Sequence, residues 1–596
     1  MDRVKYSLVL TSLLVSQLSA TKPIQLDTIY ITTASNTKQN FLNTTSNIDI
    51  ITKDDLEEKH YVNVVEALYK ELGVSFTTNG GLGQSTSLYL RGLDTKKVLV
   101  LIDGIRVNDP SNIGGVDVSN LLINNIERIE VLKGAQSGIW GADASAGVIN
   151  IITSKDIKTD LFLEYGSFNT KKVMISTGKK SDTYIFKIGG NFLKSDGFTA
   201  MKPKEANKDD FEDDGYENKS INLNISTNIN ENDKLSAGFN FIDAKSEFDA
   251  GNWEDSIEKK ANSHEEEKSI SKLYNLKYIL DRGAVKSNFY LKGSDFSRDF
   301  YYENGFEYSF KGDIKEYGFK TRFNHQNDSF TMIGAEYKRF NHDKVGTYNN
   351  RALYLTNSTK INNLNIINLA IRGDEFNKFK NKITYKVGLK HYHKFLDNFI
   401  SSFNYSTAYN TPSVYQLSGP YGNESLIPED TKGYDISLTV NDLKVTYFKN
   451  ETKDMIDFDM STFKYNNISK KSTIRGVEVS YFKSIDVLSS TLKLNYNYLD
   501  THLLRRPKHT FVANYDYYGI ENLHLGVNLQ YIGKRKDIGE VDTGRYTVIN
   551  LISNYYLSDK VTLFAKVDNI TDRNYQEVDG YATSGINAYI GLKASY

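Results

Sequence analysis

The most regular feature of the sequence is an alternation of apolar and polar residues that recurs along its last three quarters. In the final eleven residues, one face carries Ile586, Ala588, Ile590, Leu592, Ala594 and Tyr596, and the other face is polar or small. This length and period match a tilted strand that crosses a membrane. An ordinary strand of a soluble sandwich has the same pattern, so this segment alone leaves both possibilities open.

Similar segments recur from about residue 161 to the C-terminus. Short turns such as NINENDK alternate with long polar loops, notably Ser195–Lys219 and Asp249–Lys268. Short turns at one rim and long loops at the other are typical of outer-membrane barrels. At about 20 residues per strand and connection, this region predicts about 22 antiparallel strands, a barrel wide enough to need a plug. We therefore expect an all-β membrane protein with a β-barrel over 156–596.

Residues 36–155 have a different pattern, which predicts a compact mixed α/β domain. A helix is expected to begin at the capping residue Thr52 and to end at Gly73. Four short apolar runs separated by glycine turns predict strands, within STSLYLRG, KKVLVLIDGIRV, IERIEVLKG and AGVINIIT. A domain of this size that precedes a wide barrel is suited to fill its lumen as a plug.

Composition narrows the classes of function. Residues 1–20 have a basic start, an apolar stretch and a small final residue, which predicts a signal peptide. The chain has no cysteine and a net charge of −1, which argue against a thiol nucleophile and against nucleic-acid binding. Neither HExxH nor GxSxG occurs, so we expect no enzyme and no catalytic residues.

Two runs resemble the plug of TonB-dependent outer-membrane receptors, namely LYLRGLDTKKVLVLIDGIRVND (Leu88–Asp109) and IERIEVLKGAQSGIWGADASAGVINIITSK (Ile126–Lys155). Ala135 and Trp140 stand where the family commonly has Pro and Tyr. The resemblance implies a monomer in the outer membrane of a Gram-negative cell, in contact with its lipid, and driven by the energy-coupling protein TonB.

Within residues 21–35, one segment resembles the TonB box of these receptors. It consists of Asp27, Thr28, Ile29, Tyr30, Ile31, Thr32 and Thr33. An unpaired strand offers free N–H and C=O groups to the edge of a partner's sheet, so we expect TonB to bind it by strand addition. The alternative is that this strand packs onto the chain's own sheet.

The cobalamin (vitamin B12) branch of the family fits the plug loops NGGLGQSTSLYLRG and VNDPSNIGGVDVSNL best, and the resemblance implies active import of a corrinoid. A ferric siderophore or haem receptor of the same architecture is the main alternative, and a passive channel or adhesion barrel is a third. The expected substrate-binding residues lie in two plug loops and in barrel loops: Gln84, Ser85, Ser87, Asn112, Ile113, Trp253 and Tyr421.

Carboxylates crowd into two neighbouring loops, KDDFEDDGYENKS and DAKSEFDAGNWED. Calcium takes 6–8 oxygen ligands with loose geometry, whereas an acidic loop facing water needs no metal. The resemblance implies that calcium orders the substrate loops, with Glu212, Asp214, Asp249 and Asp255 as ligands. Another ligand position of the family falls near Thr199, where this chain has no acid.

Overall fold

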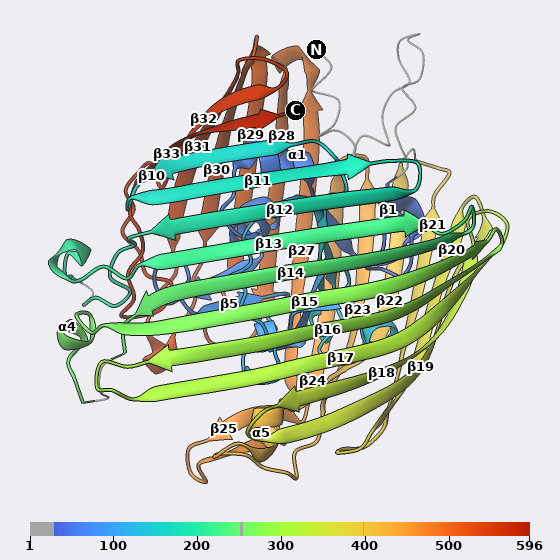
Figure 1. The fold of residues 1–596 in the computed structure, drawn as a ribbon, viewed down its shortest axis with the longest axis horizontal. Helices are drawn as coiled ribbons and strands as arrows, with labels where there is room; N and C mark the ends of the chain where they lie inside the picture. The colour runs from blue at the N-terminus through green and yellow to red at the C-terminus, as the bar shows by residue number, and fades with distance from the viewer. Residues whose placement is uncertain (1–28, 204, 251–253, 397) are drawn as a thin grey trace.

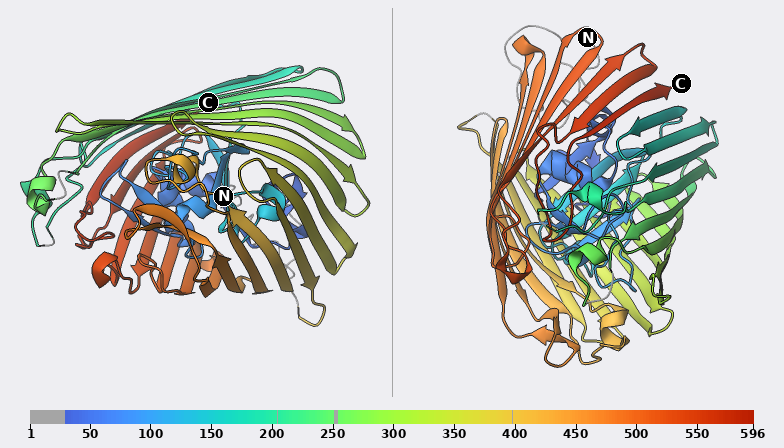
Figure 2. Two further views of the ribbon diagram at one scale, coloured as in Figure 1. Left: turned by 90° about the horizontal axis from the view of Figure 1, so that it is seen from below. Right: turned by 90° about the vertical axis from the view of Figure 1, so that its left-hand side faces the viewer.

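The computed structural model describes residues 29–203, 205–250, 254–396 and 398–596. The expected signal peptide, the box residues Asp27 and Thr28, and the expected substrate residue Trp253 lie outside these ranges. The described chain forms a closed antiparallel barrel of 22 strands around an N-terminal domain, which confirms the predicted fold class (Figures 1 and 2).

Each barrel strand pairs with its neighbours in sequence, and the last strand pairs with the first. The barrel strands are β10 (Asp160–Gly166), β11 (Thr170–Lys180), β12 (Tyr184–Ser195), β13 (Tyr216–Asn228), β14 (Asp233–Phe248), β15 (Glu265–Arg282), β16 (Val285–Tyr301), β17 (Glu307–Asn324), β18 (Phe330–His342), β19 (Gly346–Asn362), β20 (Asn365–Phe376), β21 (Lys382–Tyr392), β22 (Phe399–Asn410), β23 (Glu429–Val440), β24 (Leu443–Lys453), β27 (Ser472–Ile485), β28 (Ser490–Asp500), β29 (His509–Ile520), β30 (Leu523–Ile532), β31 (Tyr546–Tyr556), β32 (Val561–Asp568) and β33 (Asn587–Ser595).

The predicted alternation holds along the barrel wall. On β18, Ile333 is 46% exposed on the outside, whereas the side chain of Glu336 is buried on the lumen side. Strand β10 pairs with β33, with Leu163 opposite Leu592, so the sheet has no free edge. Closure satisfies every backbone group of a sheet that crosses lipid, where water is absent.

The connections also follow the predicted asymmetry. The long-loop end carries η6 (Lys208–Asp210), α4 (Ile257–Lys260), α5 (Val414–Ser418), the hairpin of β25 (Met455–Asp459) and β26 (Lys464–Ile468), and η8 (Ile538–Glu540). The C-terminus and the short turns, one of which contains η7 (Asp486–Leu488), lie at the opposite end (Figure 1).

The N-terminal domain lies inside the barrel, enclosed by strands in both views of Figure 2. Its elements are β1 (Tyr30–Ile31), β2 (Gln39–Asn40), η4 (Phe41–Asn43), β3 (Ile48–Thr52), α1 (Lys53–Lys59), α2 (Val64–Leu72), β4 (Ser75–Thr78), β5 (Thr86–Tyr89), η5 (Thr95–Lys97), β6 (Val98–Ile102), β7 (Ile105–Arg106), β8 (Ile126–Lys133), α3 (Ser137–Trp140) and β9 (Gly147–Thr153). The main sheet has the order β3-β8-β9-β6-β7. All four predicted strand runs contribute to this domain's sheets.

The predicted single helix between Thr52 and Gly73 is instead two helices. Its ends are as expected, because Thr52 forms a capping box with Asp55 and Gly73 adopts the left-handed conformation. The break comes at His60, which is left-handed (φ 49°), and Asn63 caps the second helix. The ring of His60 stacks on Phe564 of the barrel, with centroids 3.7 Å apart, so a contact distant in sequence holds the residue at the break.

The expectation of an unpaired strand at the N-terminus is wrong in this structure. Tyr30 and Ile31 pair with Asn40 and Gln39, and Ile31 is fully buried. The strand therefore rests on its own domain, through a hairpin that forms when the chain turns back after Thr33.

A buried ion pair joins the plug to the lumen wall. Arg91 of the plug donates from Nε (3.1 Å) and Nη2 (2.8 Å) to the two carboxylate oxygens of Glu478 on β27. Removing one partner of such a buried pair leaves an uncompensated charge, which typically costs about 3–5 kcal/mol. In the described ranges, no helix is long and apolar enough to cross a membrane.

Candidate functional site

The first plug loop connects β4 to β5 and lies at the long-loop end of the barrel. Gln84 is only 4% exposed, and its amide donates to the backbone carbonyl of Glu247 at 2.5 Å. Its side chain is therefore engaged with the barrel rather than presented to a ligand. Ser85 is exposed and Ser87 is half-buried, so these two hydroxyls are the accessible part of the expected set.

The second plug loop, residues 109–115, is a compact turn. The backbone N–H and hydroxyl of Ser111 both donate to Asp109 Oδ1 at 2.7 Å. Arg298 on β16 donates to Asp109 Oδ2 (3.2 Å) and to the carbonyl of Ser111 (3.3 Å). These bonds leave Asn112 half-buried and Ile113, which is 39% exposed, at the tip.

Of the two expected aromatic residues, only Tyr421 lies within the described ranges. It is 48% exposed and packs edge-to-face on Phe458 of the β25–β26 hairpin, with ring centroids 5.7 Å apart. An exposed ring that a second ring supports is a suitable flat surface for an apolar or conjugated ligand.

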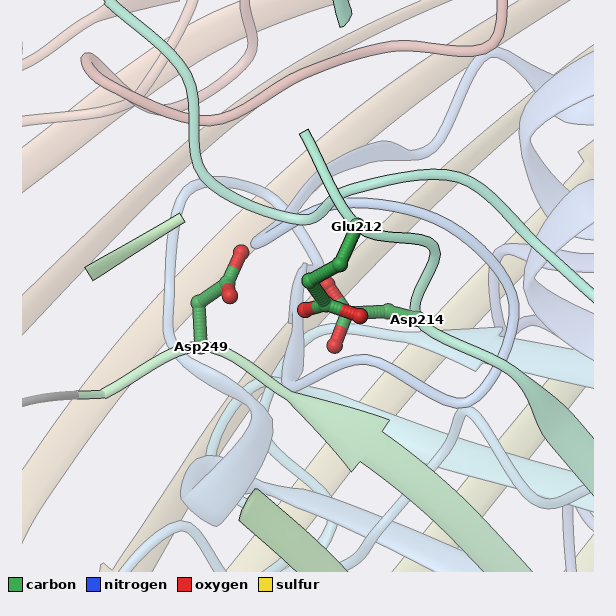
Figure 3. Close-up of side chains that lie close together, drawn as sticks. All are labelled: Glu212, Asp214 and Asp249. Carbon is green, nitrogen blue, oxygen red and sulfur yellow. The ribbon is translucent and has the colours of Figure 1, made fainter. Parts of the chain in front are cut away.

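Three carboxylates from two loops converge in Figure 3. Glu212 and Asp214 lie in the β12–β13 loop and Asp249 follows β14, and one carboxylate oxygen from each lies within 4.8 Å of the others. Asp214 and Asp249 are 3% and 5% exposed. Such a cluster of acids is unfavourable without a compensating charge, because neighbouring carboxylates repel.

The electrostatics of this cluster fit a bound cation. Burial raises the pKa of Glu212 to about 8 and that of Asp214 to about 9, and the neighbouring carboxylates add to both shifts. Glu212 Oε1, Asp214 Oδ1 and Asp249 Oδ1 are buried, and no group within the described ranges donates a hydrogen bond to them. Hard carboxylate oxygens in loops are the ligands that calcium prefers. The three residues therefore fit the expected ion.

The fourth expected ligand is not part of this cluster. Asp255 Oδ1 accepts a hydrogen bond from Lys259 Nζ at 2.7 Å, one turn later in sequence. Thr199, near which the sequence places another ligand position of the family, lies at the cluster as an uncharged neighbour, because its hydroxyl donates to Asp249 Oδ2 at 3.3 Å. Sequence reasoning missed His264, whose Nδ1 lies 3.7 Å from Glu212 Oε2.

The carboxylate cluster is connected to the first plug loop through residues 199–201. The backbone N–H groups of Ala200 and Met201 donate to Asp214 Oδ2 (2.5 Å) and Asp249 Oδ2 (2.6 Å). Ala200 in turn lies against Gly80, where an added Cβ would stand 2.9 Å from the Cα of Ala200. The position of the acidic loops and that of the plug loop are therefore coupled by direct packing.

Comparisons with known proteins agree with this architecture. The family model "TonB dependent receptor-like, beta-barrel" matches residues 162–570, and "TonB-dependent Receptor Plug Domain" matches residues 41–148. A curated relative, the vitamin B12 transporter BtuB of Vibrio cholerae serotype O1, is 25% identical, and the alignment covers 99% of each chain.

Similar solved structures include siderophore receptors. A mutant ferric enterobactin receptor from Pseudomonas aeruginosa, in complex with enterobactin, has a TM-score of 0.78 at 16% identity, over 93% of this chain and 100% of that one. The siderophore receptor PirA from Acinetobacter baumannii has a TM-score of 0.78 at 17% identity, over 92% and 98%. At these identities the likeness concerns the fold.

The barrel, the plug in its lumen and the match of both family models lead to one conclusion. The chain belongs to the TonB-dependent receptors, transport proteins of the Gram-negative outer membrane that bind a substrate and couple to TonB.

Proposed function

We propose that this receptor imports cobalamin or a related corrinoid across the outer membrane. The observation that carries the proposal is the carboxylate cluster of Glu212, Asp214 and Asp249, which packs through Ala200 against the first plug loop. Calcium bound there would fix both loops and so preorganise the surface that the substrate meets. Similarity to a vitamin B12 transporter over 99% of both chains supports the same substrate class.

The accessible groups of the plug loops also favour a corrinoid. Ser85, Asn112 and Ile113 are neutral, and the nearby cation Arg298 is bound to Asp109 and to the carbonyl of Ser111. A large, nearly neutral molecule with an amide-studded rim suits hydroxyl and amide partners. An anionic iron chelate would gain more from free cations, because charge-assisted hydrogen bonds are about twice as strong as neutral ones.

After binding, import requires the plug to rearrange, because it fills the lumen. In our proposal TonB pulls on the box at residues 27–33 after that segment leaves β2. The docked position of β1 then represents the state before coupling, in which the strand is held by the plug.

A ferric siderophore is the second candidate, since the solved structures with this fold include siderophore receptors. Equilibrium binding of radiolabelled cyanocobalamin, ferric enterobactin and haem to the purified protein, with and without calcium, separates the candidates. We expect saturable cobalamin binding that weakens in a chelator and in Asp249→Asn. Asp255→Asn, outside the cluster, is the matched control. Binding of an iron chelate or haem with none of cobalamin would overturn the proposal and leave the family assignment intact.

A further inference from the structure

The outer wall of the barrel has a groove across strands β16–β21, which lie next to one another in Figure 1. Its volume is 860 Å³, within the range of pockets that hold small ligands. Strand register places one row of outward residues along it, which runs through Phe289, Phe319, Ala335, Leu353, Gly373 and Ile383. The groove is therefore a feature of the lipid-facing surface and is separate from the lumen.

The shape of the groove follows from side-chain size along that row. Ala335 and Gly373 are its small members, and a Cβ added at Gly373 would meet nothing within 4 Å. The flanking residues are large and exposed: Phe319 is 44%, Leu353 69% and Ile383 74% exposed. Small residues between large apolar ones make a channel in which a hydrocarbon chain gains contacts that a flat surface does not offer.

The next rows toward the long-loop rim change from apolar to aromatic and then to cationic. Tyr317 and Tyr337, with ring centroids 6.3 Å apart, line the groove one row nearer that rim than Phe319 and Ala335, as in the aromatic girdle of a membrane interface. Arg351 is opposite Tyr337, and Arg339 is two residues further along β18. The two guanidinium groups therefore belong to the outer edge of the apolar band.

Both arginines are exposed, and neither has an ion pair or hydrogen bond to another side chain in the described part of the chain. Glu375 is opposite Arg351 in the register but makes no ion pair with it. The nearby lysines are already paired, Lys315 with Asp295 at 2.6 Å and Lys382 with Asp430 at 2.6 Å. Two free guanidinium groups on adjacent strands are suited to a phosphate, which arginine binds in a bidentate manner.

We propose that this groove binds a phosphorylated lipid of the outer leaflet, with one acyl chain over Ala335 and Gly373 and its phosphate on Arg339 and Arg351. The two arginines would bind the phosphate, and the apolar channel would hold the acyl chain. Along the strands the arginines lie nearer the long-loop rim than the channel does, as a lipid headgroup lies nearer the membrane surface than its tail. The site lies outside the lumen, so it does not depend on which substrate is imported.

Native mass spectrometry of the full-length protein in detergent tests this proposal. The probes are diphosphorylated lipid A, its deacylated headgroup and inorganic phosphate. Arg339→Gln/Arg351→Gln should weaken lipid A binding by at least about tenfold, because two charge-assisted contacts are lost. Lys432→Gln/Lys449→Gln is the matched control, since these cations of β23 and β24 are paired with Glu451. Gly373→Leu, which fills the channel, should weaken lipid A but leave the deacylated headgroup unchanged.

Equal lipid binding by the wild type and the double arginine variant would overturn the proposal. So would phosphate or headgroup binding as tight as that of lipid A, which would reduce the site to an anion contact. A lipid-free dimer that Gly373→Leu dissociates would instead assign the groove to a second copy of the chain.

Discussion

The carboxylate of Glu130 holds Thr33 against the plug. Its Oε2 accepts hydrogen bonds from the hydroxyl (2.5 Å) and the backbone N–H (2.9 Å) of Thr33, and from the N–H of Thr32 at 3.0 Å. Trp140 adds a bond from its indole N–H to the carbonyl of Thr33 at 2.8 Å. The segment that resembles the TonB box is therefore anchored at its C-terminal end by a buried charge on β8.

Removing that anchor should free the segment. Glu130→Ala deletes the acceptor of four hydrogen bonds from Thr32 and Thr33, and of one from Arg128 Nε. Hydrogen bonds to a charged group contribute about 1.5–3 kcal/mol in net terms. Because the chain has no cysteine, Ser35→Cys introduces a single thiol at a site that is 2% exposed. We expect its labelling by a maleimide to accelerate at least about tenfold in Glu130→Ala. Glu127→Ala is the control, and an unchanged labelling rate in Glu130→Ala would show that other contacts hold the segment.

Proline in the segment should separate binding of substrate from import. The carbonyl of Ile29 accepts a hydrogen bond from the N–H of Phe41 at 2.9 Å, and proline at position 29 keeps this carbonyl. Proline lacks the backbone N–H that strand addition needs as a donor. Cells with Ile29→Pro should bind radiolabelled cyanocobalamin at the surface as the wild type does, with uptake abolished. Ile29→Val should transport normally. Normal uptake by the proline variant would mean that the box lies elsewhere.

Calcium affinity should rise with pH. The pKa of Glu212 is about 8 and that of Asp214 about 9, both above their ordinary values, so calcium must displace protons from the cluster below these values. The stability of the metal-free loops should depend on pH in the opposite direction, because the folded loops hold protons more tightly than the unfolded chain does. Their stability is therefore highest below pH of about 4 and falls as pH rises through about 8 to 9.

Isothermal titration of calcium at pH 6, 7.5 and 9 checks this prediction, with proton release obtained from buffers of different ionisation heat. Asp214→Asn should remove most of the pH dependence and weaken binding at least about tenfold, whereas Asp255→Asn should do neither. A pH-independent affinity would contradict a site made of these buried carboxylates.

The first plug loop should tolerate no side chain at Gly83. A Cβ there would stand 2.1 Å from the ring of Tyr216 on β13, and the residue has a φ of +77°. Gly104 has the same φ and nothing within 4 Å, so Gly104→Ala carries the backbone strain without the clash. We expect Gly83→Ala to lower substrate affinity at least about tenfold, because the loop must move, and Gly104→Ala to leave it unchanged. Equal affinities in both variants would show that the loop adapts without affecting the site.

Much of the architecture followed from local pattern. The alternation along the last strand, β33, predicted lipid-facing and lumen-facing sides, because side chains of a strand point to opposite faces in turn. Thr52 and Gly73 marked the ends of a helical segment through cap chemistry that depends on only a few neighbouring residues. The acidic loops were also visible as composition, and three of the four expected calcium ligands converge in the structure.

Only the tertiary structure decided which of these groups meet. Asp249 lies beside Glu212 and Asp214, whereas Asp255 pairs with Lys259. The side chain of Gln84 donates a hydrogen bond to the carbonyl of Glu247, 163 residues later in the chain. His60, at the break between the two helices, stacks on Phe564, and Thr33 docks because Glu130 is buried beneath it. The sequence pattern determines the hydrophobic periodicity of a helix or strand and its capping residues, because both depend only on neighbouring residues in the chain. Contacts between segments distant in the chain depend on how the plug fits the closed barrel, and that fit is set by packing in three dimensions.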